Sequence, residues 1–301
     1  MKSPAVPLRP GHPYLAGSPL LVAHRGGAGL APENTLEAFH QAVEIWRADM
    51  LELDVRLSGD GEVMVIHDAT VDRTTDGTGL VSAHTRAELQ ALDAGARFTD
   101  PSGRSSFRGQ QVRIPTLDEV LEAFPLMRVN AEAKEAAVAA PLVEVVRRHG
   151  AEDRVLVAAG RESDRDAAQG YSGPWGASRE QVARLWLLAR LPGAQRLFGR
   201  RYRPTCDILQ VPESWRGLQI VTVAFVAAAH RRNLPVQVWT VDDPERMRRL
   251  LRLGVDGIQT DRPDLLARVL HEDTGRPLPP GLTEQVKAEP GAGGSSHRPA
   301  S

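Results

Sequence analysis

The sequence has one cysteine, Cys206, no long apolar run and almost no net charge. A single cysteine excludes a disulfide within the chain, which fits a reducing compartment, and we expect Cys206 to be a small packed residue. No stretch approaches the run of about 18 apolar residues that spans a membrane, so no stable membrane insertion is expected. A formal net charge of −1 leaves no basic field for nucleic-acid phosphates, so no nucleic-acid partner is expected.

The two ends of the chain differ in composition from the rest. Residues 1–19 are rich in proline and glycine, and prolines stand where a signal peptide has its apolar core. We therefore expect an N-terminal arm on a cytoplasmic protein. Residues 275–301 have low complexity, which predicts a disordered tail. The remaining 20–274 are expected to form one domain, close to the about 250 residues of a single α/β barrel.

Between the ends, short apolar runs alternate with stretches of helical periodicity. Eight runs are typical of strands, the fifth least clearly: "PLLVAHRG", "DMLELDVRL", "LMRVNAEAK", "RVLVAAG", "GPWGAS", "DILQVP", "PVQVWTV" and "VDGIQTD". Helical patterns such as "NTLEAFHQAVEIW" follow most of them, here with Asn34 as the expected N-cap and Glu37 three residues later. Eight strand–helix alternations predict a (β/α)8 barrel, the TIM barrel.

One segment interrupts this alternation. Residues from about 57 to 115, between the second and third barrel strands, contain a strand-like "EVMVIHD" and a short helical "TRAELQALD". We interpret the segment as a small insertion that caps one end of the barrel.

Two of the expected strands carry one apolar and one polar row, because strand side chains alternate between faces. The polar rows are Met50, Glu52, Asp54 and Arg56 on the second strand and Asn130, Glu132 and Lys134 on the third. The apolar rows suit the surrounding helices, so the polar rows must face the barrel interior. Three carboxylates then meet at the carboxyl-end rim, where active sites of this fold lie. Such a cluster needs a counter-charge, which predicts a divalent cation with oxygen ligands, Mg²⁺ or Ca²⁺.

Internal ion pairs are the alternative explanation, Glu52 with Arg56 and Glu132 with Lys134. A site is favoured because two neighbouring strands are polar and the first strand ends in His24 and Arg25. His67, which ends the strand of the insertion and precedes Asp68, is the second acid–base candidate. The guanidinium of Arg25 suits phosphate.

Seven segments together resemble the glycerophosphodiester phosphodiesterases: "HRGGAGLAPENT", "ELDVRLSGDGEVMVIHD", "DRTTDGTG", "IPTLDEVL", "NAEAK", "VWTVDD" and "DGIQTDRP". They occur in the family's order between about Leu20 and Leu270. The resemblance implies a TIM barrel with an insertion after strand 2. It also implies metal-dependent hydrolysis of a small-molecule glycerophosphodiester to an alcohol and sn-glycerol 3-phosphate.

By position, the resemblance places the metal on Glu52, Asp54 and Glu132 and makes His24 and His67 the acid–base pair. It implies that Arg25 and Lys134 hold phosphate oxygens. The first attack comes either from the neighbouring glycerol hydroxyl, through a cyclic phosphate, or directly from water.

Three further residues are read less directly. Trp239 ends the seventh strand and is either a core tryptophan or a wall for the glycerol or alcohol group; the resemblance favours the wall. Gln210 faces inward on the sixth strand and is expected to line the pocket. Glu33 either supports the site or is a first-turn acid favoured by the helix dipole.

Three other functions are alternatives to this one. A lysophospholipase D would use the same residues but needs an apolar channel, for which "REQVARLWLLARLPGAQRLFGRRY" is the candidate segment; an ordinary barrel helix is favoured there. A non-catalytic phosphate-binding barrel would have lost a histidine or a metal carboxylate, and this sequence keeps all of them. A phosphoinositide-type phospholipase needs accessory domains for which the chain has no room.

Overall fold

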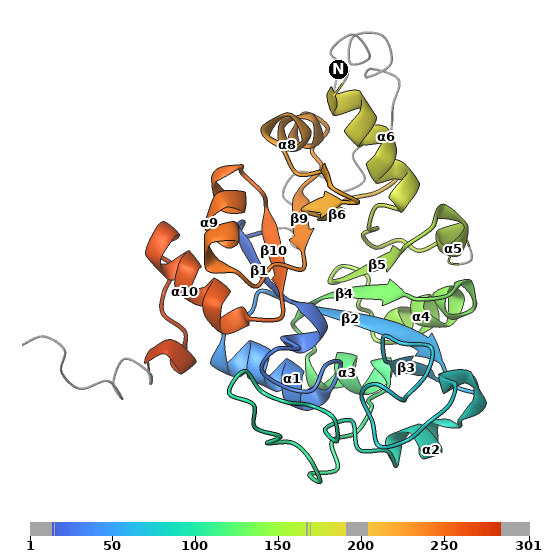
Figure 1. Ribbon diagram of the computed structural model, residues 1–301. Helices are drawn as coiled ribbons and strands as arrows, with labels where there is room; N and C mark the ends of the chain where they lie inside the picture. The colour runs from blue at the N-terminus through green and yellow to red at the C-terminus, as the bar shows by residue number, and fades with distance from the viewer. Residues whose placement is uncertain (1–13, 15, 167, 169, 191–203, 284–301) are drawn as a thin grey trace, which may run out of the picture.

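The computed structural model describes residues 14, 16–166, 168, 170–190 and 204–283. Its main sheet is parallel and runs in the order β5-β4-β2-β1-β10-β9-β6 (Figure 1). The strands are β1 (Leu20–Ala23), β2 (Met50–Leu57), β4 (Arg128–Ala133), β5 (Val155–Ala159), β6 (Leu209–Pro212), β9 (Val236–Trp239) and β10 (Gly257–Thr260). Each coincides with one of the expected apolar runs.

The remaining run, "GPWGAS", closes the barrel between β5 and β6. Val157 pairs in parallel with Trp175, and Gly176 pairs in parallel with Ile208. Backbone hydrogen bonds from Gly176 to Val157 (2.9 Å) and from Ala177 to Ile208 (2.9 Å) join this segment to both neighbours. Within the described residues, eight parallel segments therefore complete the predicted (β/α)8 barrel.

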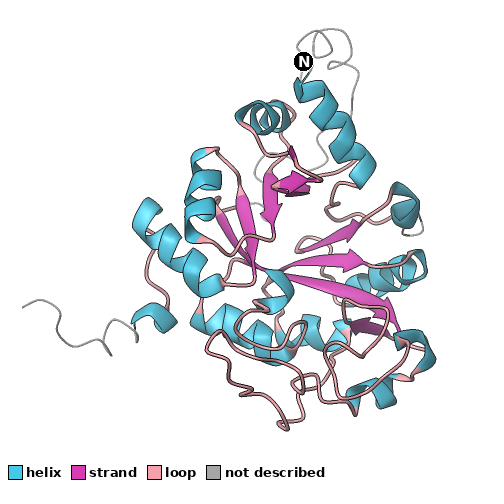
Figure 2. Ribbon diagram, in the orientation of Figure 1, coloured by secondary structure: helices cyan, strands magenta, loops and turns pink. Residues whose placement is uncertain are grey.

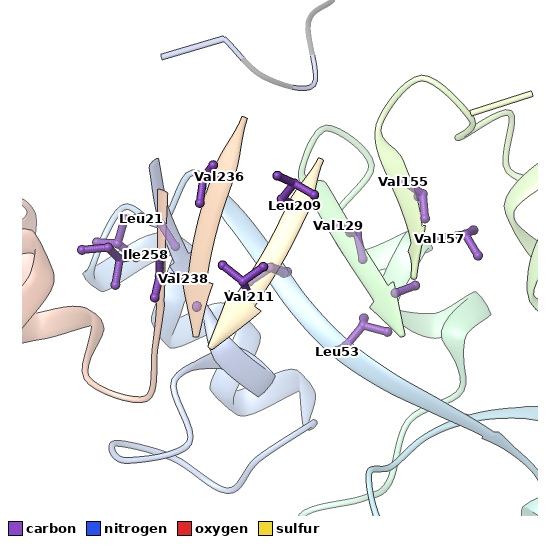
Figure 3. Close-up of a cluster of buried hydrophobic side chains, with 14 of the residues drawn as sticks. Leu21, Leu53, Val129, Val155, Val157, Leu209, Val211, Val236, Val238 and Ile258 are labelled. Atoms are coloured by element: carbon purple, nitrogen blue, oxygen red, sulfur yellow. The ribbon is translucent and has the colours of Figure 1, made fainter. Parts of the chain in front are cut away.

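Helices surround the sheet and cover the outward rows of the strands (Figure 2). They are α1 (Leu36–His40) with the π-helical η3 (Gln41–Ile45), α3 (Leu117–Ala123), α4 (Ala136–Arg148), α5 (Glu162–Asp166), α6 (Arg179–Arg190), α8 (Val223–His230), α9 (Pro244–Arg252) and α10 (Pro263–Thr274). The outward side chains form one buried apolar cluster with the helices (Figure 3). Removing this apolar surface from water is the main force that holds helices on the barrel.

The inward rows separate into an apolar floor and a polar rim. Leu20, Val22, Met50, Leu156 and Ile208 form the floor, together with Tyr14 from the N-terminal segment. The two polar rows face inward above this floor, as their alternation predicts. The apolar rows of the same strands lie in the outer cluster.

The insertion forms a small subdomain with its own apolar core. Its elements are β3 (Val63–Val65), η4 (Val81–Ala83) and α2 (Arg86–Gln90). Met64, Ile66, Val71, Leu89 and Ile114 are among the residues of its separate apolar cluster. It attaches to the barrel because β3 pairs antiparallel with the last three residues of β2.

The start of α1 differs from the expectation. Thr35, and not Asn34, is the N-cap, since the Thr35 hydroxyl accepts a hydrogen bond from the Ala38 N–H at 3.2 Å. Both residue types cap helices well, so local sequence does not separate them. Asn34 instead adopts a positive φ of 59° and directs its side chain into the barrel rim.

Parts of three expectations lie outside the described residues. These are most of the N-terminal arm (1–13 and 15), the end of the tail (284–301), and residues 191–203 of the apolar, arginine-rich segment. Residues 179–190 of that segment form α6, which packs beside α8 as a barrel helix. Cys206 is buried, as expected. Among the described helices, none combines the length and the apolar character needed to cross a bilayer.

Replacing a leucine of the outer cluster should destabilise the barrel. Leu53 is fully buried between β2 and the helices, so Leu53→Ala removes packed atoms and leaves a cavity. We expect a loss of about 2–5 kcal/mol in the free energy of unfolding, measured by urea denaturation. The control is Leu126→Ala, because Leu126 is 91% exposed. Equal losses for the two variants would contradict the assigned burial.

Candidate active site

Three carboxylates meet inside the carboxyl-end rim of the barrel. Glu52 and Asp54 extend from β2, and Glu132 extends from β4 directly opposite Asp54 in the parallel ladder. One oxygen of each residue lies within 4.8 Å of the others. Asp54 is only 1% exposed, so the cluster holds much negative charge away from water. A buried charge of this kind must be paired or must bind a cation.

Two cationic side chains contact the cluster on its Asp54 side. Lys134 Nζ lies 3.0 Å from both Asp54 Oδ1 and Glu132 Oε2, and Arg25 Nε lies 3.2 Å from Asp54 Oδ2. Burial opposes the charge of Asp54, but Lys134 and Arg25 outweigh burial and lower its pKa. The same contacts raise the pKa of Lys134 against the effect of its burial. Both cations therefore stay charged at neutral pH.

Glu52 is less well compensated. It accepts the backbone N–H of Arg25 at 2.9 Å, and His24 Nε2 lies 3.9 Å away. Burial and the neighbouring charge of Asp54 raise the pKa of Glu52 above its usual range. Burial disfavours the charged form of His24, but Glu52 and Asp261 outweigh it and raise the pKa of His24. On this side of the cluster, His24 is therefore the cationic group that faces Glu52.

Each histidine is held by an aspartate through the same ring nitrogen. His24 Nδ1 lies 2.7 Å from Asp261 Oδ1, and His67 Nδ1 lies 2.6 Å from Asp68 Oδ1. Because a carboxylate only accepts hydrogen bonds, Nδ1 donates in both pairs, and Nε2 is left for proton transfer. His67 also lines a cavity between the insertion and the barrel, together with Glu33 and Asn34.

The backbone of β2 and the insertion fixes the place of His67. The N–H of Ile66 donates to the carbonyl of Asp54 at 2.9 Å, and Arg56 Nε donates to the carbonyl of His67 at 2.8 Å. The insertion thereby brings a residue that follows β3 to the level of the carboxylate cluster.

Asn34 and Glu33 support the cluster from the loop after β1. Asn34 Nδ2 donates to Asp54 Oδ2 at 2.9 Å. Glu33 bonds Arg25 Nη1 at 3.0 Å and also pairs with Arg73 of the insertion. Of the two interpretations of Glu33, the structure favours support of the site.

The ion-pair alternative is confirmed in one of its two pairs. Lys134 does contact Glu132, but Arg56 contacts Glu135 at 3.3 Å and not Glu52. The confirmed pair does not replace the site, because within the described residues no arginine or lysine side chain forms a salt bridge with Glu52.

Gln210 and Trp239 lie on β6 and β9, on different strands from the three carboxylates. Gln210 Nε2 donates to Gln237 Oε1 at 3.3 Å, and the same oxygen accepts from Asn130 Nδ2 at 3.1 Å and from Gln259 Nε2 at 3.3 Å. Gln210 thus belongs to a cluster of amides beneath the rim. Trp239 is 41% exposed at the end of β9, so it is not a core tryptophan.

Sequence reasoning missed three residues of the site: Asn34, Asp261 and Arg73. Asp261 continues the inward row of β10 two residues after Gln259, so the alternation used for the other strands could have found it. Asn34 was assigned to the helix cap. Arg73 had no local signal, because its partners lie 5 and 40 residues away in the chain.

Comparisons with known proteins identify the family of the chain. Residues 24–265 match the model of the glycerophosphoryl diester phosphodiesterase family. The chain belongs to this family. It is 35% identical over 257 residues to a probable glycerophosphodiester phosphodiesterase 2 of Mycobacterium tuberculosis, covering 84% of this chain and 91% of that protein. It is 34% identical to a glycerophosphodiester phosphodiesterase of Caldanaerobacter subterraneus, covering 84% and 98%.

Solved structures of the family share the fold. An Oleispira antarctica phosphodiesterase, determined in complex with the product sn-glycerol-3-phosphate, superposes with a TM-score of 0.64 at 28% identity, covering 84% of this chain and 97% of that one. A glycerophosphodiester phosphodiesterase of Agrobacterium tumefaciens superposes with a TM-score of 0.66 at 29% identity, covering 83% and 99%. The chain is an enzyme of this family, and its fold is the TIM barrel.

The hydrogen bond from Asn34 to Asp54 should stabilise the rim. Glycine tolerates the positive φ of Asn34, so Asn34→Gly removes the amide without adding backbone strain. A buried carboxylate then loses a donor, and we expect a loss of about 1.5–3 kcal/mol in the free energy of unfolding. Asn233→Gly is the matched control, since Asn233 has a φ of 53° and an exposed side chain. Equal effects in urea denaturation would show that the amide contributes nothing.

Proposed function

We propose that this chain hydrolyses glycerophosphodiesters, in a metal-dependent reaction, to an alcohol and sn-glycerol 3-phosphate. The observation that carries the proposal is the cluster of Glu52, Asp54 and Glu132 with Arg25 and Lys134 beside it. Anionic ligands for a cation and cationic donors for a phosphate thus share one rim. Membership of the family supports the same chemistry.

The carboxylates fit a hard divalent cation, Mg²⁺ or Ca²⁺. All three offer oxygen donors, which these ions prefer, and one oxygen of each lies within 4.8 Å of the others. A cation held by Glu52, Asp54 and Glu132 supplies Lewis-acid polarisation of the phosphate and neutralises charge that develops in the transition state.

The protein's own side chains bind the phosphate and move the protons. Arg25 and Lys134 are held in place by Asp54, which leaves their other N–H groups to contact phosphate oxygens. Of His24 and His67, one takes the proton of the attacking hydroxyl, from water or from the neighbouring glycerol carbon. The other donates a proton to the departing alcohol. Asp261 and Asp68 keep the proton on Nδ1 and so orient each imidazole.

The ends of the substrate lie towards β6 and β9 in this proposal. Trp239, exposed at the rim, offers an apolar wall for the glycerol or alcohol group. Gln210 lines the bottom of the substrate pocket in this proposal, and its amide donates a hydrogen bond to Gln237.

Metal dependence is tested by chelation and by calorimetry. Turnover of glycerophosphocholine should stop when EDTA removes the metal and return with Mg²⁺ or Ca²⁺. In titration calorimetry with either ion, Glu132→Gln should weaken binding, since it removes one of three anionic ligands. Glu122→Gln on the exposed face of α3 should bind as the wild type does. Full turnover in protein shown by elemental analysis to be metal-free would contradict the metal assignment.

The acid–base assignment is tested with His24→Ala and His67→Ala. Each should lower kcat by about 10²–10⁴, because general acid–base catalysis contributes rate factors of this size. His40→Ala on the exposed side of α1 is the control. Wild-type rates in either histidine variant would overturn its role.

The substrate class is tested by comparing product release from glycerophosphocholine, glycerophosphoethanolamine, glycerophosphoglycerol and lysophosphatidylcholine. Hydrolysis of the lysolipid alone would support the lysophospholipase D instead.

A further inference from the structure

Arg73 lies in the turn-rich segment of the insertion and contacts two acidic residues at once. Its Nε donates to Asp68 Oδ2 at 2.6 Å, while Nη1 and Nη2 donate to the two oxygens of Glu33, each at 2.7 Å. The contact with Glu33 is a two-bond fork, the strongest geometry for an arginine–carboxylate pair.

Both partners of Arg73 contact residues of the proposed active site. The other oxygen of Asp68, Oδ1, bonds His67 Nδ1 at 2.6 Å. Glu33 Oε1 also accepts Arg25 Nη1 at 3.0 Å. Arg73 is therefore the link between the histidine supplied by the insertion and the phosphate-binding arginine supplied by the barrel.

The backbone of His67 is fixed without Arg73. It is held by the pairing of β3 with β2, by Arg56 and by the separate apolar core of the insertion. None of these contacts is made by the imidazole ring of His67. Asp68 restrains the ring, and Arg73 in turn restrains Asp68, which is otherwise a part-exposed side chain with several rotamers.

We propose that Arg73 is a positioning residue, which aims the His67 imidazole by holding Asp68 against Glu33 on the barrel. The proposal rests on the proposed function, because it needs His67 to transfer a proton. Arg73 acts through Asp68, so its loss should disturb the orientation of the ring and leave the insertion folded. Misplacement of a reacting group by about 1 Å can cost about 10²-fold in rate.

The test is Arg73→Met, with Arg104→Met as the matched control. Arg104 lies in the same insertion, is 79% exposed in its side chain and pairs only with Asp100 in the described residues. On glycerophosphocholine we expect Arg73→Met to lower kcat by about 10–100-fold with KM nearly unchanged. The melting temperature should fall, because Glu33 and Asp68 lose hydrogen-bond donors, but the variant should stay folded at the assay temperature. Arg104→Met should keep the wild-type kcat.

A double-mutant cycle separates positioning from a general structural effect. If Arg73 acts through His67, Arg73→Met adds no further loss to His67→Ala, whereas independent roles multiply. Asp68→Ala should reproduce the loss and should likewise be non-additive with Arg73→Met, which keeps the proposal testable if one variant is unstable. A wild-type kcat in Arg73→Met, or losses that multiply, would overturn the inference.

The same measurements distinguish failure of this inference from failure of the proposed function. An inactive wild type, or a His67→Ala variant with full activity, would remove the proposed function itself. An active wild type with a slow His67→Ala and a fast Arg73→Met would remove only the role of Arg73.

Discussion

The rim of the barrel depends on the meeting of three carboxylates, two of them buried, in one place. Parallel pairing sets Asp54 directly beside Glu132, and Glu52 lies one inward position below Asp54 on β2. Such charges repel one another more strongly away from water than at a surface. Three side chains stabilise this charge by contacting Asp54: Arg25 and Asn34 from the loop after β1, and Lys134 from the end of β4. In the proposed function, Glu52, Asp54 and Glu132 together hold the cation.

A second constraint is that the site comes from two separately packed parts. The barrel supplies the carboxylates and His24, whereas the insertion, with its own apolar core, supplies His67. Extension of β2 beyond the barrel joins the parts, because its last residues pair with β3. A line of charged contacts through Asp68, Arg73 and Glu33 then reaches Arg25 across the junction. The insertion thus contributes a proposed catalytic residue to the site and does not only cover it.

Much of this follows from alternation along single strands. Polar rows on β2 and β4 face inward because the apolar rows must meet the helices, and the same rule extends to Asp261. The fifth strand is the least clear from its sequence, "GPWGAS", and in the structure it is also the least regular. Trp175 and Gly176 pair with the neighbouring strands through isolated bridges and not through a continuous ladder. Thr35 is the N-cap of α1, whereas the side-chain amide of Asn34 donates a hydrogen bond to Asp54 on β2. This contact joins two elements that are distant in the chain, so the local sequence does not indicate it.

The sequence by itself determined the strand positions, the inward direction of Glu52, Asp54 and Glu132, and the family, because each depends on local periodicity or on short motifs. Only the tertiary structure decided which charges meet. Lys134 bridges two carboxylates, Arg56 turns to Glu135, and Arg73 spans from the insertion to Glu33. Such pairings depend on distances between elements far apart in the chain, and those distances are set by how the insertion and the barrel pack.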